Sequence, residues 1–371
     1  MDWKTLYTPI VKGKENDFRA IGRIPRELAL RTFPLVELVP PEEQEKLDKA
    51  YFRFCDNLRR NCGWQRVSVD LHAISPDQRV RGGGHALEAV FGMLKGTGID
   101  FVPVFGLDHE PELWGRIAKI VREGERGLTF RIRGDDLLLP DDTLNELLDH
   151  LNRERLDSRK VNLMVDLGAL YGMDTPEVET WRSRAQDFID LATTATPFAL
   201  VSLVGSSMPK HVGDVPMQGE MAIPRRELRL WLDVANSLRH VRIAFGDYGV
   251  VHPNFSAKMR GKHTNAKIRY TSARSHNIFR GYRLSDGLKY KQFYDLSRRV
   301  VSADVFLEAA YSFGDDYLWR CANRDVSHGH LGTWVEVDMS HHLVFTAMQL
   351  DRIEARVADG MSMSDFESIV Q

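Results

Sequence analysis

The sequence predicts a (β/α)8 barrel of the TIM type, followed by a C-terminal α+β elaboration that packs over the barrel mouth. Eight short apolar runs recur along the first 249 residues, and each is followed by a helix-like segment or a loop. Strands that alternate with helical patterns pair in parallel through crossover helices. Eight such units within roughly 250 residues are typical of a closed barrel. We therefore assign residues 1–249 to the barrel and residues 250–371 to an extension packed on it.

The eight runs are short and bounded by turn residues, which is typical of buried strands rather than helices. The run at 161–168 shows the pattern most clearly, because it ends on the carboxylate of Asp166 and a glycine turn. In chain order the runs are TPIVKG (8–13), PLVELVP (34–40), VSVDLH (67–72), FVPVFG (101–106), LTFRIRGDD (128–136), VNLMVDLG (161–168), FALVSLVGS (198–206) and VRIAFGDYG (241–249).

Segments with helical spacing of apolar residues separate the runs. Pro25 interrupts the first of them, so we expect a broken helix there. The segment at 40–60 begins with prolines and acidic residues, as helix starts do. The expected helices cover residues 15–30, 40–60, from about His85 onward, 109–124, 140–156, 175–195 and 223–239, the last of which precedes the eighth strand.

Beyond residue 249 the alternation of strands and helices stops. A long basic loop at 250–267 could contact phosphates through Lys258, Arg260, Lys262 and His263, although a solvated basic face explains the same charges. A loop of this length in a compact domain is usually functional or mobile. After it we expect a strand pair at 268–284, a helix at 287–301 and a last helix at 343–357.

Composition narrows the classes of function. The formal charge of −2 gives no global attraction to nucleic acid or to a membrane, so nucleic-acid binding would need a local basic patch. Three cysteines without metal-ligand spacing fit a reducing compartment. The N-terminus has no signal-peptide core, and no apolar stretch is long enough to span a bilayer. We expect a cytoplasmic protein without a membrane partner.

Polar residues recur within the apolar runs. Successive side chains of a strand point to opposite faces, and the outer face of a barrel strand packs under helices and must be apolar. The polar residues should therefore point into the barrel near its mouth, where barrel enzymes keep their catalytic groups. These residues are Glu37, Ser68, Asp70, His72, Thr129, Arg131, Arg133, Asn162, Asp166, Ser202 and Asp247.

Carboxylates beside basic side chains at the mouth allow two chemistries. They could hold a hard divalent cation, which prefers oxygen ligands, or they could divide general acid and base roles without one. An enzyme of this kind would be hydrolase-like, with a divalent cation as its candidate cofactor. The predicted catalytic residues are Glu37, Asp70, Asp166 and Arg133.

Basic residues at the mouth indicate an anionic ligand. Arginine binds carboxylates and phosphates through bidentate contacts, so we predict Lys12, Arg131 and Asp247 as ligand-binding residues for a nucleotide-like anion. The same residues have a structural alternative. Arg131 or Arg133 could pair with Asp166 in a satisfied ion-pair network, of the kind that often fills barrel interiors.

Five stretches of the chain resemble one known family. They are YTPIVKGKENDFRAI (7–21), PLVELVP (34–40), IRYTSARSHNIFRGY (268–282), SFGDDYLW (312–319) and TWVEVDMSHH (333–342). They span nearly the whole chain in order, and on them the sequence resembles the phage-associated Beta protein family. The resemblance implies a role in phage–host conflict, because the family's namesake is similar to an immunity factor that restrains a toxic partner within a defence cassette. It implies no reaction.

The resemblance adds residues of the extension to the candidate site. Arg280 and His342 join the predicted ligand-binding residues, on a surface over the barrel mouth. The adjacent His341 and His342 are a poor metal chelate, and capping of the last helix, with one ring buried and one exposed, is the alternative. The positions that match the family are Lys12, Glu37, Arg269, Tyr270, Arg280, Gly281, Gly314, Asp315, Trp334, His341 and His342.

Two functions are consistent with the sequence. In the first, the chain is an immunity or effector-control component of an antiphage system and binds a protein partner from the same cassette. In the second, it is a barrel enzyme or sensor that acts on a phosphate-bearing, nucleotide-like ligand at the mouth. The resemblance favours the first, and the polar residues at the strand ends favour the second.

Overall fold

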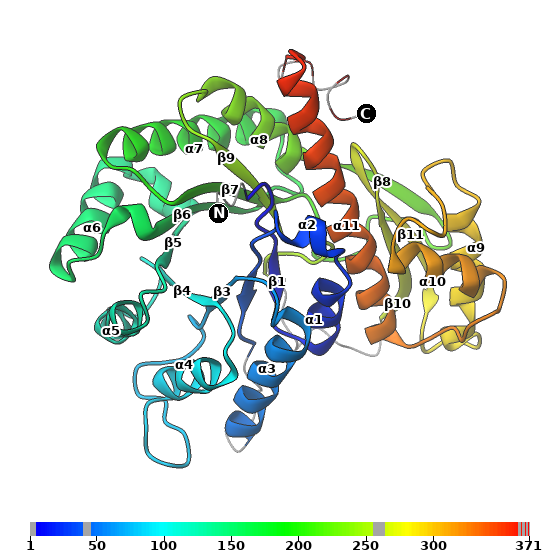
Figure 1. Cartoon of the computed structure of the whole chain (residues 1–371). Coiled ribbons are helices and arrows are strands. Elements are labelled where there is room, and N and C mark those ends of the chain that lie inside the picture. Colours follow the sequence, from blue (N-terminus) through cyan, green and yellow to red (C-terminus); the bar gives the residue numbers. More distant parts are fainter. Residues whose placement is uncertain are drawn as a thin grey trace.

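The computed structural model describes residues 5–39, 46–254, 264–362, 365, 368 and 370. Its centre is a sheet of eight parallel strands, each paired with the next (Figure 1). The strands are β1 (Ile10–Lys12), β2 (Leu35–Glu37), β3 (Val67–Asp70), β4 (Phe101–Gly106), β5 (Leu128–Arg133), β6 (Val161–Ala169), β7 (Leu200–Ser206) and β9 (Ile243–Asp247). The register aligns the carboxyl ends of the first three strands, because Lys12 pairs with Glu37 and Glu37 with Asp70.

The first and last strands meet at a seam. Tyr7 forms a parallel bridge with Phe245. The Thr8 N–H donates to the Phe245 carbonyl at 2.8 Å, and the Phe245 N–H donates to the Leu6 carbonyl at 3.0 Å. The eight strands therefore form a barrel, and the predicted (β/α)8 fold is confirmed.

Helices cover the outside of the barrel, and a small apolar cluster that includes Met164 and Tyr248 fills its interior. Pro25 separates the first two helices, which confirms the expected break. Residues 40–45 lie outside the described part, so the helix expected at 40–60 is described from Leu47 onward. The helices are α1 (Glu15–Gly22), α2 (Arg26–Ala29), α3 (Leu47–Cys62), α4 (Ala86–Thr97), α5 (Trp114–Gly124), α6 (Pro140–Arg153), α7 (Thr175–Ala195) and α8 (Arg226–Ser237), with short 3-10 helices η2 (Pro111–Leu113), η3 (Gly134–Leu138) and η4 (Ser158–Lys160).

A second, three-stranded antiparallel sheet has the order β10-β11-β8. Its strands β10 (Asn265–Thr271) and β11 (Ser275–Arg283) are the predicted strand pair. The third strand, β8 (Glu220–Pro224), comes from the segment between β7 and α8, whose end at 223–224 we expected to be helical. One face of this sheet packs against α9 (Phe293–Val301), and α10 (Phe313–Ala322) belongs to the same apolar cluster. The short 3-10 helix η6 (Lys289–Gln292) precedes α9. The basic residues expected at 258–263 lie outside the described residues.

The last helix differs from the prediction. α11 (Leu331–Ala358) begins at Leu331 rather than at residue 343, and the His330 ring Nδ1 caps it by accepting from the Gly332 N–H at 3.0 Å. α11 runs between the barrel and the second sheet (Figure 1). Its middle is buried almost all round, so its sequence lacks the single apolar stripe by which surface helices are recognised. His341 and His342 lie inside this helix and are both buried, so neither caps it.

None of the helices in the described part of the chain combines the length and apolarity needed to cross a lipid bilayer.

We expect Gly246→Ala to destabilise the barrel seam. An added Cβ at Gly246 would lie 2.5 Å from Val204 Cγ2 and 2.9 Å from the Thr8 carbonyl oxygen. Overpacking of this kind costs about 1–3 kcal/mol, which urea unfolding would measure. Gly92→Ala is the matched control, because nothing lies within 4 Å of its added Cβ. Because Gly92 is an exposed residue inside helix α4, its replacement by alanine should stabilise the protein by about 1 kcal/mol. Equal stability of the two variants would contradict close packing at the seam.

Candidate functional site

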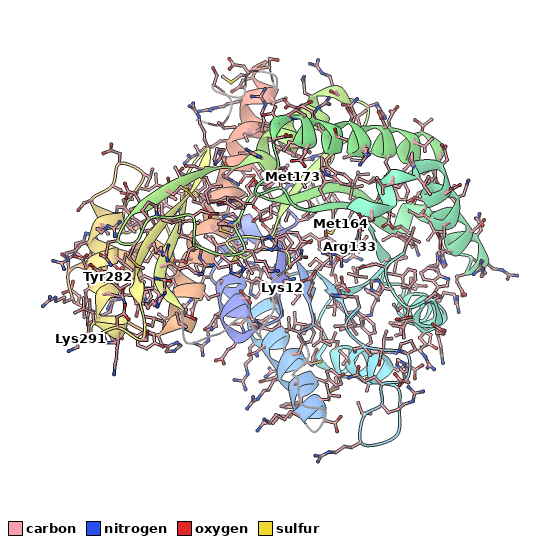
Figure 2. All side chains as sticks on the ribbon, turned by 180° about the vertical axis from the view of Figure 1, so that it is seen from behind. Lys12, Arg133, Met164, Met173, Tyr282 and Lys291 are labelled. Carbon is pink, nitrogen blue, oxygen red and sulfur yellow. The ribbon has the colours of Figure 1, made fainter. Side chains whose placement is uncertain are left out.

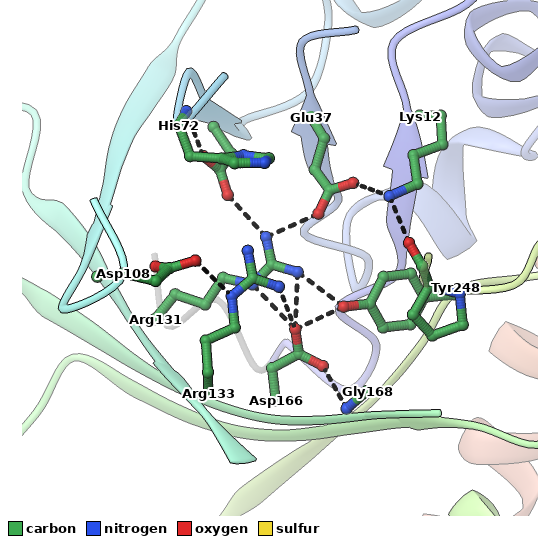
Figure 3. A network of polar contacts seen from close by, with 12 residues as sticks. Lys12, Glu37, His72, Asp108, Arg131, Arg133, Asp166, Gly168 and Tyr248 are labelled. Atoms are coloured by element: carbon green, nitrogen blue, oxygen red, sulfur yellow. Dashed lines mark hydrogen bonds and ion pairs between the residues drawn. The ribbon is translucent and has the colours of Figure 1, made fainter. Parts of the chain in front are cut away.

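The polar side chains at the carboxyl ends of the strands form one buried network inside the barrel mouth (Figure 3). Parallel strands in register bring these ends together, and alternation turns the polar residues inward. In Figure 2, Lys12 and Arg133 both lie within the ring of strands. The network joins six of the predicted site residues, namely Lys12, Glu37, Asp70, Arg131, Arg133 and Asp166.

Arg131 is fully buried at the centre of this network. Its Nη1 donates to Glu37 Oε1 at 2.8 Å and to Asp70 Oδ2 at 2.7 Å. Its Nη2 and Nε donate to Asp166 Oδ2 at 2.7 and 3.0 Å, and Nη2 also donates to the Tyr248 hydroxyl at 2.7 Å. The Tyr248 hydroxyl in turn donates to Asp166 Oδ2 at 2.5 Å. One guanidinium therefore shares its charge among three carboxylates.

The cations keep these buried carboxyl groups ionised. Burial raises the pKa of Glu37, but Arg131 and Lys12 outweigh it and hold that pKa below its usual value. Burial likewise raises the pKa of Asp166, and Arg131 and Arg133 reverse the effect. At neutral pH the carboxylates are therefore charged, and their oxygens already accept hydrogen bonds from the basic side chains.

Two histidines that follow strands β3 and β4 approach the outer side of the network. His72 Nδ1 lies 3.2 Å from Asp70 Oδ1, and His109 Nε2 lies 3.4 Å from the same oxygen. Burial lowers the pKa of His109, but Asp108 and Asp70 outweigh it and raise it to about 9. Arg133 is half-buried, and its Nε donates to Asp108 Oδ2 at 2.9 Å. The network thus extends from a sealed centre to a partly exposed edge.

The arrangement does not fit the divalent cation considered from the sequence. The Arg131 guanidinium occupies the space between Glu37, Asp70 and Asp166, the carboxylates that would be its ligands. Within the described ranges, no group of three or more His, Cys, Asp or Glu side chains could hold a metal ion. The structural alternative is present instead, because Arg131 and Arg133 pair with Asp166 at 2.7 and 3.3 Å. The predicted catalytic roles stay predictions.

A basic pocket of about 430 Å³ lies beside the network, between the barrel mouth and the second sheet. Among the described residues, six lysines and arginines line it, but a single carboxylate, that of Asp17, does so. Lys12 belongs both to the pocket and to the network, where it pairs with Glu37 and donates to the Pro253 carbonyl at 2.9 Å. The basic residues that line the pocket are Lys12, Lys14, Lys210, Lys267, Arg269 and Arg280.

The second sheet places three of these cations on one face. Lys267 and Arg269 lie on β10, and Arg280 is the residue directly opposite Lys267 on β11. Arg269 Nε donates to Asp338 Oδ2 at 2.9 Å, and Arg280 Nη1 donates to the Val215 carbonyl at 2.6 Å. Like charges directly opposite each other destabilise a sheet. An anion between Lys267 and Arg280 would remove that repulsion.

Buried groups without full hydrogen bonding mark the pocket wall. Burial raises the pKa of Asp17 to about 7, although nearby basic residues act against it. Burial also raises the pKa of Asp338 to about 6 despite its contact with Arg269. Within the described structure, Asp17 Oδ1 and Arg280 Nε are buried and have no hydrogen-bond partner. The pocket is therefore strongly cationic near neutral pH and holds polar atoms that a ligand could satisfy.

Two predicted ligand-binding residues lie away from the pocket. Asp247 was expected to point into the mouth, and this was wrong, because the next residue, Tyr248, points inward. Asp247 faces α11, where its Oδ2 accepts from His342 Nε2 at 2.9 Å and its Oδ1 accepts from the Tyr7 hydroxyl at 2.7 Å. His342 Nδ1 lies 2.8 Å from Thr271 Oγ1. These buried contacts fasten α11 to the barrel and to β10.

Sequence reasoning missed Tyr248, Asp17 and Lys267. Alternation along the eighth run allows two choices: either Asp247 points inward, or Gly246 and Tyr248 do. We expected the first choice from the sequence, and the structure shows the second. The alternation of Lys267 and Arg269 with apolar neighbours was a readable signal of a half-buried strand. Asp17 carries no such signal, because only the packing of α1 beneath the pocket buries it.

Replacing Arg131 with methionine should strongly destabilise the protein. The change leaves Glu37, Asp70 and Asp166 buried without their shared cation, and removal of one partner of a buried ion pair costs about 3–5 kcal/mol. Carboxylates with depressed pKa values contribute stability at neutral pH, and this is lost as the pH falls through those values. The deficit of the variant in urea unfolding should therefore be smaller at about pH 4 than at about pH 7.

Arg133→Met is the matched control, since this half-buried arginine contacts only one of the three carboxylates, Asp166. It should cost less than Arg131→Met, and equal losses would contradict the central role of Arg131.

Solved structures that are similar to the chain include the following two. A protein assigned as a fructose-1,6-biphosphate aldolase from Coccidioides immitis is 12% identical, with a TM-score of 0.38 over 93% of this chain and 91% of that chain. The 3-dehydroquinate dehydratase of Aquifex aeolicus VF5 is 12% identical, with a TM-score of 0.32 over 67% of this chain and 92% of that chain. No curated protein matches the chain. The model of the family described as Beta protein matches residues 7–347. The chain therefore belongs to the Beta protein family.

Proposed function

We propose that this barrel binds a phosphate-bearing, nucleotide-like ligand in the basic pocket at its mouth, as a sensor or as an enzyme. One observation carries the proposal. Six lysines and arginines line the described part of the pocket beside one carboxylate, although the formal charge of the whole chain is −2. The positive charge is thus concentrated locally, and a local concentration of one sign attracts and holds an oppositely charged ligand.

The residues that line the pocket suit a ligand with an anionic part and an apolar part. Lys210 lies exposed at the rim, while Lys267 and Arg280 form the wall, so phosphate oxygens could receive charge-assisted hydrogen bonds from several sides. Val250 and Trp334 also line the pocket and offer an apolar surface to the organic part of the ligand.

If the ligand is turned over, the acid–base group is a histidine of the pocket and not a carboxylate of the central network. Asp70 and Asp166 are fully buried and paired with Arg131, whereas His211 and His252 line the pocket itself. A group that exchanges protons with a ligand must be able to reach it. A hydrolase-like reaction with His211 or His252, which line the pocket, is the enzymatic form of this proposal.

Lys210→Glu should weaken the binding of inorganic pyrophosphate and ATP about tenfold, or by about 1.4 kcal/mol, as measured by isothermal titration calorimetry at low salt. Added salt should weaken binding to the natural protein as well, because exposed charges are screened. Lys95→Glu makes the same charge change on an exposed part of α4 that does not line the pocket. Equal weakening in both variants, or no binding by the natural protein, would overturn the proposal.

We further propose that the chain acts in phage–host conflict, as an immunity or effector-control component that works through a protein partner from the same cassette. Membership of the Beta protein family supports this role. Ligand binding in the pocket would then control the partner.

A phage-plating assay on the native gene cassette tests this role. Deletion of the gene should change plating efficiency by at least about tenfold, and unchanged plating would contradict the role. Lys210→Glu should reproduce the deletion, while Lys95→Glu should behave as the natural gene. If Lys210→Glu instead retains full function, the partner is controlled through a surface other than the pocket.

A further inference from the structure

We infer that Lys267 is a reactive amine that forms an imine with an aldehyde or ketone group of an anionic ligand in the basic pocket. This inference rests on the proposed function, because the cationic pocket must first hold the anion. The ligand class is therefore an oxo acid or a phosphorylated carbonyl compound.

The position of Lys267 follows from the alternation along β10. Ala266 and Ile268 are fully buried in the apolar cluster against α9, so Lys267 and Arg269 face the other way, toward the pocket. Arg280 lies directly across from Lys267. In the described part of the chain, no carboxylate lies within ion-pair distance of Lys267. Its ammonium form is thus placed between like charges without a partner anion.

These surroundings favour the neutral amine. Burial lowers the pKa of Lys267 to about 8, and Arg269 and Arg280 add to the effect while Asp338 opposes it. The neutral amine is the nucleophile in imine formation, and lysines are activated by desolvation or by a neighbouring cation. At about pH 8, an unperturbed lysine, with a pKa of about 10.4, is almost entirely protonated.

Two other lysines of the pocket, Lys12 and Lys210, differ in this respect. Lys12 pairs with Glu37 and donates to the Pro253 carbonyl, so its side chain already has partners. Lys210 is exposed to water at the rim. Lys267 combines burial, flanking arginines and access to the cavity.

The step needs no other reactant. The Nζ lone pair forms a bond to the carbonyl carbon, and the π electrons of the C=O bond move to the oxygen, which takes up a proton. The resulting carbinolamine loses this oxygen as water, so a protonated amine and a carbonyl compound yield a protonated imine and one water molecule. Asp17 lines the same pocket, and burial raises its pKa to about 7, which suits a carboxyl group that holds and returns a proton.

Pyridoxal 5′-phosphate is a suitable probe, because it joins an aldehyde to a phosphate. At about pH 8, where the Lys267 amine is partly neutral, it should form an imine absorbance band with the whole chain. Borohydride reduction should fix the adduct on Lys267, and peptide mass spectrometry would locate it. Inorganic pyrophosphate should protect the lysine by at least about fivefold in labelling rate. Lys95→Arg is the matched control and should keep the adduct.

Lys267→Arg keeps the positive charge and removes the primary amine. It should lose the imine band, while a far-UV circular dichroism spectrum and a melting temperature like those of the natural protein would show that it is folded. Labelling of Lys267 no faster than that of exposed lysines such as Lys95 would overturn the inference. If pyrophosphate binds while Lys267 stays unlabelled, the anion pocket stands and the reactive amine is rejected. If pyrophosphate neither binds nor protects, the proposed function itself fails.

Discussion

The mouth of the barrel depends on the buried guanidinium of Arg131. Strands β2, β3 and β6 each bring a carboxylate to the same point, and these would repel one another without a cation among them. Arg131 removes the repulsion and keeps the carboxylates ionised, but it also uses the oxygens that a metal ion would need. The centre of the mouth is therefore a structural ion-pair network. We therefore expect a ligand at the edge of the network and in the pocket beside it. Lys12 belongs to both the network and the pocket.

The pocket depends in turn on α11. Its two adjacent histidines point to different partners, because neighbouring residues of a helix are rotated by about 100° from each other. His342 lies 2.9 Å from Asp247 of the barrel, while His341 lies 2.9 Å from Asp315 at the start of α10. The pair thus connects the barrel to the second sheet and its helices. Trp334, about two turns earlier on the same helix, lines the pocket, so these buried contacts hold the pocket wall in place.

Charge is distributed differently in the two adjoining sites. In the central network, carboxylates and cations contact each other directly, and this pairing offsets the free-energy cost of burying the charges. In the pocket, cations outnumber the single carboxylate of Asp17 among the described lining residues. A surplus of one charge in a partly buried place is costly unless a ligand compensates it. For this reason the pocket, and the lysine in its wall, are the places where we expect the ligand.

The sequence by itself determined the barrel and six charged members of the central network, but not Tyr248. Short apolar runs, helical spacing and strand alternation are local patterns, so they indicated the eight strands and turned Glu37, Arg131 and Asp166 to one interior. Only the tertiary structure decided what those residues contact, and that Asp247 faces His342 instead of the mouth. It also decided the pocket, because α1, the segment at 208–213 and β10, which all line it, come from distant parts of the chain. Their contact depends on how α11 packs between the two sheets, and no periodic pattern within one segment of the sequence indicates that packing.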